Sequence, residues 1–242
     1  MGLGDYMEKE EIKKENKKMD DKKFNKLVKT MAIGIILILI TIIVTIVVLA
    51  YILSKNVGNM MLEKPIIYIY PEEEIGLNVK VGYPNKLTCT YPTYNNGWNV
   101  LAKPDGTLID TATGRELYSL YWEGKGTVAV NMKEGFVVKG SEVQSFLEEK
   151  LKILGLTDKE AQEFIIYWLP RLQNNEYNYI RFAESNEINE CMPLEFSEAP
   201  DTIIRVLMQF KGLDKYVYVE EQQLQTPKRE GFTIVEWGGT EI

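Results

Sequence analysis

The sequence contains no histidine among its 242 residues. This absence excludes catalytic triads and dyads that use a histidine base, and zinc or iron sites with histidine ligands. Basic residues are also too few to balance the acidic ones, because 28 Lys and Arg against 35 Asp and Glu give a formal net charge of -7. Phosphate backbones are bound by basic surfaces, so we expect no nucleic-acid partner.

Cysteine is scarce as well, with only Cys89 and Cys191. Two thiols are too few for a closed structural zinc site. In an oxidising compartment they could form one disulfide, whereas elsewhere they would be two small apolar side chains, and the sequence leaves both readings open. The phosphate-binding pattern G-x-x-x-x-G-K-[ST] and the G-x-S-x-G elbow are both missing, and we expect no cofactor.

One long stretch, residues 31–54, carries no charge, and sixteen of its 24 residues are Ile, Leu or Val. As a helix it would reach ~36 Å, which exceeds the ~30 Å hydrocarbon core of a bilayer. It is longer than the apolar part of a signal peptide and no A-x-A cleavage site follows it. We therefore predict a transmembrane helix over 31–54 in contact with the lipid bilayer; a buried helix of a soluble protein is the alternative.

The flanks of this stretch predict its orientation. Residues 11–30 contain eight lysines and residues 55–74 contain two. Because positive charge is retained on the cytoplasmic side, we expect residues 1–30 to be a cytoplasmic tail and the C-terminal part to be extracytoplasmic. The expected organisation is a single-pass cell-membrane protein with a stalk over 55–64 and a folded domain over 65–242.

The expected domain is rich in β-structure. Apolar residues alternate with polar ones from Ile75 to Val81, and the same pattern recurs at short intervals. The other segments with strand-like patterns are Leu87–Tyr91, Trp98–Ala102, Glu116–Trp122, Thr127–Met132, Phe136–Val138, Tyr177–Phe182, Thr202–Phe210, Val217–Val219 and Phe232–Trp237. Spacings near ten residues favour an antiparallel sandwich or barrel.

Two helices are expected in the middle of this domain. Ser141–Gln144 fits a capping box, and Thr157–Glu160 fits another. Gly155 separates the two helices, and Pro170 is expected to end the second near Trp168. The fold class is therefore α+β, with a β-rich domain around a central helical pair; one domain, or two lobes at about 65–140 and 141–242, both remain possible.

Several segments resemble a family of uncharacterised bacterial proteins, of a clostridial type, that often have an N-terminal membrane anchor. The residues that carry the resemblance are KPIIYIYP (64–71), LTCTYPTYNNGW (87–98), AKPDGTL (102–108), YSLYWEG (118–124) and GFTIVEWGGTEI (231–242). The resemblance covers most of residues 64–242. It implies a shared fold and a bacterial cell-surface setting, and it supplies no catalytic residue.

Two acidic residues beside tryptophans form the candidate catalytic pair. Trp122-Glu123 ends one strand-like segment and Glu236-Trp237 ends another. If those ends met, Glu123 and Glu236 would provide the two carboxylates of a glycoside hydrolase, with Trp122 and Trp237 as ligand-binding platforms for the sugar. The alternative is that the tryptophans belong to the core and the glutamates accept structural hydrogen bonds.

Tyr94 and Trp98 are the other candidate ligand-binding residues, because they flank the Asn95-Asn96-Gly97 turn in a tyrosine-rich stretch. Aromatic and amide side chains in loops suit sugar or peptide binding, although a turn with half-buried aromatics is equally compatible. The acidic clusters match no calcium-binding loop, so no metal site is expected.

The absence of catalytic motifs favours a binding or interaction module at the bacterial cell envelope, with a polysaccharide or protein partner. A carboxylate-dependent hydrolase of envelope polysaccharide and an accessory subunit of a membrane complex are the alternatives.

Overall fold

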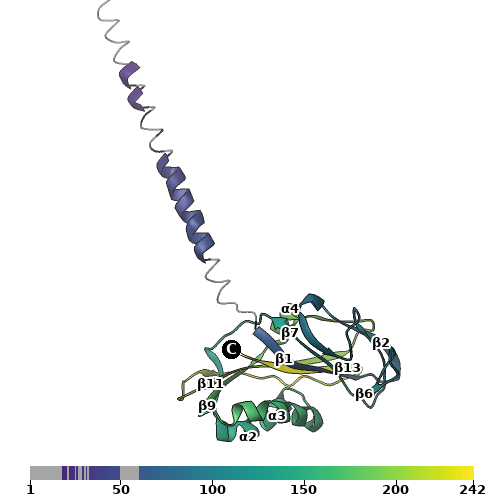
Figure 1. Cartoon of the computed structure of the whole chain (residues 1–242). Helices are drawn as coiled ribbons and strands as arrows, with labels where there is room; N and C mark the ends of the chain where they lie inside the picture. The colour runs from purple at the N-terminus through teal and green to yellow at the C-terminus, as the bar shows by residue number, and fades with distance from the viewer. Residues whose placement is uncertain are drawn as a thin grey trace, which may run out of the picture. The chain divides into compact units, whose positions relative to one another are not determined.

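The computed structural model describes residues 18–20, 22–24, 26, 29, 31, 33–49 and 60–242. The chain divides into two units, Met1–Asn56 and Val57–Ile242 (Figure 1). In the first unit, residues 33–49 are helical. Among the described residues, no helix combines the length and apolarity needed to cross a bilayer. The predicted span continues to residue 54, and its positions 32 and 50–54 lie outside the described residues, as do most of residues 1–30.

The second unit is organised around an eight-stranded sheet. In spatial order its strands are β12 (Glu220–Glu221), β8 (Glu134–Lys139), β9 (Tyr177–Ala183), β11 (Thr202–Leu213), β13 (Thr233–Glu241), β1 (Met60–Tyr70), β7 (Leu120–Gly126) and β3 (Leu87–Tyr91). Most pairs are antiparallel, but β11 and β13 run parallel, as do β8 and β12.

A smaller sheet has five strands. In spatial order these are β10 (Leu194–Phe196), β2 (Ile75–Val81), β4 (Trp98–Ala102), β5 (Leu108–Asp110) and β6 (Glu116–Leu117). The helices of the unit are η1 (Pro84–Lys86), η2 (Gly140–Glu142), α2 (Val143–Ile153), α3 (Asp158–Leu172) and α4 (Ser185–Cys191). Both sheets are open.

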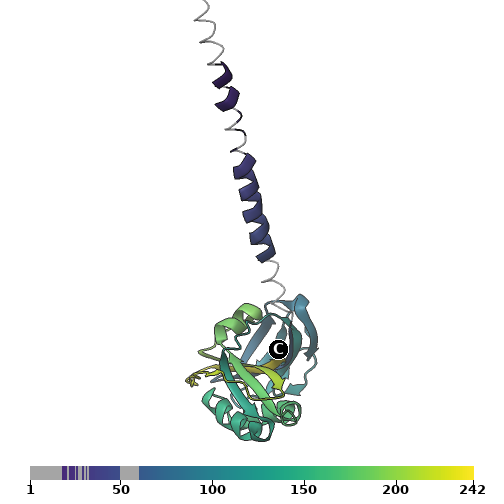
Figure 2. The same ribbon diagram turned by 90° about the vertical axis from the view of Figure 1, so that its left-hand side faces the viewer.

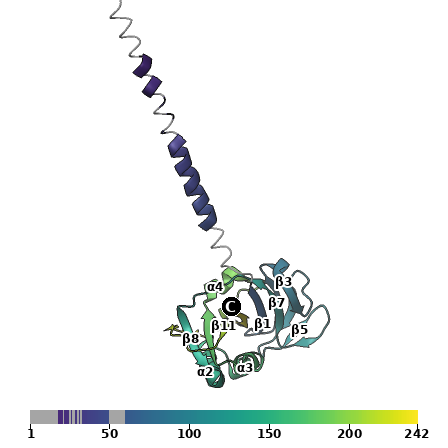
Figure 3. The same ribbon diagram turned by 60° about the vertical axis from the view of Figure 1, so that its left-hand side comes forward.

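The large sheet buries apolar residues on both faces. On one face, Ile67 and Trp122 pack with Leu77 and Trp98 of the small sheet, and α4 adds Ile188 to this cluster. On the other face, α2 and α3 contribute the buried side chains of a second cluster that includes Phe164 and Trp237. The helical pair α2–α3 and the short helix α4 therefore lie on opposite faces of the sheet (Figures 2 and 3).

Two strands from the ends of the unit meet at the middle of the large sheet. β1 pairs with β13 on one side and with β7 on the other. The register shifts between Glu63 and Ile66 in the pairing with β13 and between Leu62 and Ile66 in the pairing with β7, and Lys64 in this stretch has a φ of 57°. Because strands from the two ends of this unit pair in one sheet, as β1 does with β13, Val57–Ile242 is one compact unit.

The α+β class and the β-rich character are confirmed, and β2, β3 and β4 have the predicted bounds. The start of β1 at Met60 overlaps the predicted stalk, whose residues 55–59 lie outside the described residues. Cys89 is exposed, Cys191 is buried and both are free, so the disulfide reading is wrong.

Two predicted strands are wrong. Over Thr127–Met132 the chain forms no strand, and the carbonyl of Ala129 accepts from the side chain of Gln209 at 2.8 Å instead of from a neighbouring strand. Over Val217–Val219 the chain crosses to β12 without a strand partner, so Val217 and Tyr218 are exposed and Val219 is half-buried.

Of the two predicted capping boxes, one is present and one is not. Thr157 and Glu160 form the predicted capping box, but Ser141 lies in η2 and α2 has no side-chain cap. α3 continues through Pro170 to Leu172. A proline this close to the end of a helix removes one backbone hydrogen bond, and the burial of Trp168 and Leu172 holds the last turn in place.

Candidate functional site

Glu236 lies inside the molecule and is fully engaged in structural contacts. It faces the small sheet and α4, and 4% of its surface is exposed. Its carboxylate accepts from Trp122 Nε1 at 2.9 Å and from Arg205 Nε at 2.6 Å. Arg205 in turn donates to Asn189 Oδ1 at 2.7 Å and to the carbonyl of Met192 at 2.8 Å. This Glu236 network joins three strands of the large sheet to α4.

Glu123 lies on the opposite face of the same sheet. Side chains alternate along β7, so Trp122 faces the small sheet while Tyr121 and Glu123 face the side of α3. Glu123 Oε1 accepts from the backbone N–H of Lys64 at 3.3 Å. Burial, together with the hydrogen bond to Glu123, raises the pKa of Tyr121. The sheet therefore separates Glu123 from Glu236 and does not provide the two-sided cleft that glycoside hydrolysis requires.

The candidate tryptophans are separated in the same way. Trp122 belongs to the cluster under the small sheet, whereas Trp237 belongs to the cluster under α2 and α3. Trp237 Nε1 donates to the hydroxyl of Tyr68 at 3.2 Å, and its ring packs against Phe164 at 5.3 Å between centroids. Neither ring is exposed, and neither is available as a sugar platform.

Tyr94 and Trp98 are brought together, with their rings perpendicular and 4.8 Å apart. Trp98 is buried and donates from Nε1 to the carbonyl of Pro92 at 2.9 Å. The hydroxyl of Tyr94 accepts from the backbone N–H of Val81 at 3.0 Å. The pair thus holds the Asn95-Asn96-Gly97 turn against β2. The Tyr94 hydroxyl and the Trp98 N–H both form hydrogen bonds within the protein.

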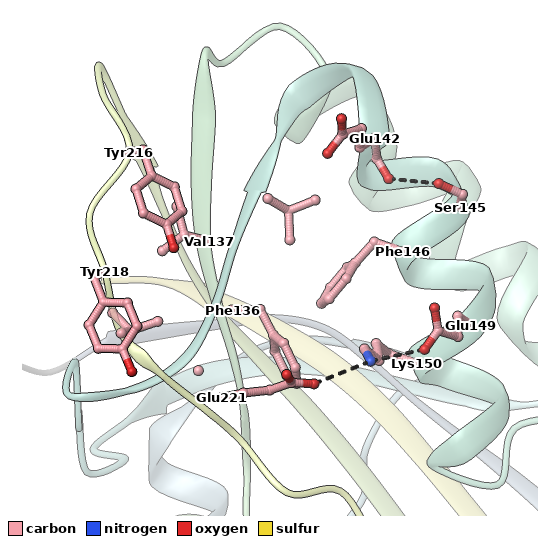
Figure 4. A pocket seen from close by; sticks show the side chains of 13 residues that line it. Phe136, Val137, Glu142, Ser145, Phe146, Glu149, Lys150, Tyr216, Tyr218 and Glu221 are labelled. Carbon is pink, nitrogen blue, oxygen red and sulfur yellow. Dashed lines mark hydrogen bonds and ion pairs between the residues drawn. The ribbon is translucent and has the colours of Figure 1, made fainter.

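An open groove beside β8 has aromatic and charged walls, and its volume is about 670 Å³. One wall is formed by the end of η2, with Glu142, and by α2, with Phe146 and Glu149. The other is the segment from β11 to β12, with Tyr216 and Tyr218, and β8 lies between the two walls (Figure 4).

The start of β8 is held in place from β9. The hydroxyl of Tyr179 lies 2.7 Å from the carbonyl of Asn131 and 2.6 Å from that of Glu134. Burial raises the pKa of this hydroxyl to about 12, so it stays a donor at neutral pH. Gly135 follows with a φ of 147°, and a Cβ there would lie 2.7 Å from the carbonyl oxygen of Ile180. Glycine is therefore needed for β8 to approach β9.

The outer edge of β8 is paired over two residues only. β12 aligns Glu220 with Glu134 and Glu221 with Gly135, and on this outer edge the described residues place no strand beside Phe136–Lys139, whose inner edge pairs with β9. A strand edge of this kind presents free N–H and C=O groups. The groove therefore exposes backbone groups that can pair with another strand, next to aromatic side chains.

The charged groups of the groove are predominantly acidic. Lys150 is its one lining cation among the described residues, against the carboxylates of Glu142, Glu149 and Glu221. Lys150 lies 3.0 Å from Glu149 and 3.9 Å from Glu221, and its ammonium is 5.1 Å from the centre of the Phe136 ring. Lys139 at the end of β8 lies 3.9 Å from Glu142, so two lysines face three carboxylates and the net charge around the groove is negative.

Little in the sequence points to this groove, because its walls come from three separate segments. The available signal is the run of aromatic and β-branched residues at Tyr216–Val219, within which a strand is predicted over Val217–Val219. The described parts of the chain contain no group of three or more Asp, Glu, Cys or His side chains suited to hold a metal ion.

Comparisons with known proteins give a partial similarity. No protein-family model matches the chain, and no solved structure matches it. A curated protein of Butyrivibrio fibrisolvens, described as an uncharacterized protein in the bglA 3' region, is 38% identical over 64 residues. The match covers 25% of this chain and 65% of that protein, so the chain spans less than two thirds of the relative. The chain is therefore similar over about a quarter of its length to an uncharacterised bacterial protein, and this similarity assigns it to no family.

Proposed function

We propose that this protein is a membrane-tethered binding module and that its partner binds in the groove beside β8. The observation that carries the proposal is the exposure of Tyr216 and Tyr218, at 57% and 77%, on the wall of an open groove. Aromatic side chains placed in solvent beside a concave surface are typical of recognition sites.

Binding is better supported than catalysis. The acidic residues nearest to tryptophans are engaged in structural contacts, since Glu236 is ion-paired with Arg205 and Glu123 accepts from Lys64. The groove has an apolar floor and an acidic rim, which can hold a ligand by shape and charge.

Tethering rests on the sequence of residues 31–54, which is uncharged and rich in Ile, Leu and Val. The excess of lysine before it favours a cytoplasmic N-terminus, which would place the binding module outside the cytoplasm at the cell envelope.

The two thiols offer a direct test of sidedness. Cys89 is exposed and Cys191 is buried, and burial raises the pKa of the Cys191 thiol, so Cys89 should react much faster with a maleimide. In intact bacteria that produce the full chain, a membrane-impermeant maleimide should label the protein, and Cys89→Ser should abolish the labelling. Labelling that requires cell lysis would contradict the extracytoplasmic location.

The groove is tested with a photo-crosslinking amino acid placed at position 218 of the full chain in cells. The matched control is position 166, because Ile166 on α3 is 65% exposed but does not line the groove. A discrete adduct at 218, absent at 166 and reduced by Phe146→Asp, would support the proposal. Equal adducts at both positions, or none at 218, would contradict it.

A further inference from the structure

We infer that the groove takes up an extended, positively charged polypeptide segment, which adds as a strand to the free edge of β8. This inference rests on the proposed function and names the class of partner. It combines the strand edge, the apolar floor and the acidic rim, each of which selects a different property of the ligand.

On the outer edge of β8, the backbone N–H and C=O groups of every second residue point away from β9 and toward the groove. The carbonyl of Lys133 accepts from the backbone N–H of Glu220 at 2.9 Å, and that of Gly135 accepts from Gln222 at 3.3 Å. Residues that alternate along a strand point their backbone groups the same way, so Val137 and Lys139 also direct N–H and C=O outward. The free edge from Phe136 to Lys139 is ~13 Å long at ~3.3 Å per residue.

The floor of the groove fits the alternating side chains of an added strand. Phe136 and Val138 point toward α2, where the ring of Phe146 packs against Phe136 at 5.1 Å between centroids. Every second side chain of a strand beside β8 would face this apolar surface, and the side chains between them would face away from it. Apolar residues at alternate positions are therefore expected in the ligand.

The rim selects for positive charge. Glu142 projects from the end of η2 and Glu149 from α2, and Glu221 lies across from them (Figure 4). Tyr216 and Tyr218 add exposed rings, whose faces attract ammonium and guanidinium groups. Lysine or arginine side chains of the ligand that reach the rim of the groove would meet these carboxylates and rings.

A second copy of this chain is a poorer occupant. Two β8 edges paired with each other would bring two acidic rims close together, and like charges without counter-charges oppose such an interface. A cationic segment of another protein has no such conflict.

Peptide binding to the full chain in detergent tests both parts of the inference. The probes are short fluorescein-labelled peptides in which valine alternates with lysine, glutamine or glutamate. The lysine peptide should bind about tenfold more tightly than the glutamine peptide, and added salt should reduce this difference. Equal affinity for all three peptides would overturn the charge selection.

Strand addition is tested by N-methylation of alternate residues in the lysine peptide. Methyl groups in one register block the hydrogen bonds to β8 and should weaken binding at least about tenfold, whereas methyl groups in the other register face away and should have little effect. Equal effects in both registers would overturn strand addition.

Variants of the protein locate the site. The double variant Glu149→Gln/Glu221→Gln should reduce the preference for lysine, whereas Glu198→Gln, an exposed glutamate outside the groove, should not. No binding of any peptide would overturn the inference, while the adduct at position 218 separately reports whether the groove has a partner. Peptide-independent dimers in sedimentation would instead identify a second copy as the occupant and would also overturn it.

Discussion

The Glu236 network and the groove beside β8 contain similar side chains in opposite environments. Around Glu236, one carboxylate, one tryptophan and Arg205 satisfy each other away from solvent. Around the groove, two exposed carboxylates pair with Lys150 and a third pairs with Lys139, and two tyrosine rings face solvent. A buried polar group must find its partners within the fold, whereas an exposed one is free to find them in a ligand. Residue type alone therefore does not distinguish the proposed binding surface from the core, whereas the number of hydrogen-bond and ion-pair partners inside the protein does.

The largest effect on stability is expected when one member of the buried Glu236–Arg205 pair is removed. Glu236→Ala should lower the free energy of unfolding by about 3–5 kcal/mol, because Arg205 would remain as a buried charge without its carboxylate. Denaturant unfolding measures the change. The double variant Arg205→Met/Glu236→Leu should lose less than the sum of the two single changes, and strict additivity would show that the pair is not coupled.

Glu160 offers an intermediate case, because its buried carboxylate pairs with the partly exposed Arg229 at 2.7 Å. Burial raises the pKa of Glu160, but hydrogen bonds from Arg229 and from the backbone of Thr157 outweigh it and hold the pKa below its ordinary value of 4.5. The stabilisation is therefore complete above pH 4.5 and is lost as the pH falls through the lowered pKa.

We expect Glu160→Gln to lower stability at neutral pH by about 1.5–3 kcal/mol, the range for hydrogen bonds to charged groups. The difference from the native chain should shrink as the pH falls below 4.5. Unfolding curves across this range measure it, and a difference that grows on acidification would contradict the assigned sign.

The smallest change in stability is expected in the groove. Tyr218→Ala should alter the free energy of unfolding by less than about 0.5 kcal/mol, because the ring is 77% exposed. The same variant should weaken binding of the lysine peptide several-fold, as measured by fluorescence anisotropy. A large loss of stability without a loss of binding would mean that Tyr218 belongs to the fold.

Local patterns predicted local structure well. The alternation from Ile75 to Val81 identified β2, and the Thr157–Glu160 capping box identified the start of α3, because each signal depends on neighbouring residues. The same alternation failed at Val217–Val219, since a strand also needs a partner and its pairing is decided far away in the sequence. The placement of Glu123 and Glu236 on opposite faces followed from the same long-range pairing, which no local pattern reveals.

The position of β13 determines when this domain can assemble. β13 fills the place between β1 and β11, and the hydrogen bond from Trp237 to Tyr68 joins residues 169 positions apart. Until residue 241 has left the ribosome, and any export channel, β1 has no β13 to pair with and the sheet remains in two halves. Contacts between such distant residues form slowly, so both halves of the sheet expose apolar strands until β13 has paired. A chaperone that shields these strands would therefore raise the yield of folded protein.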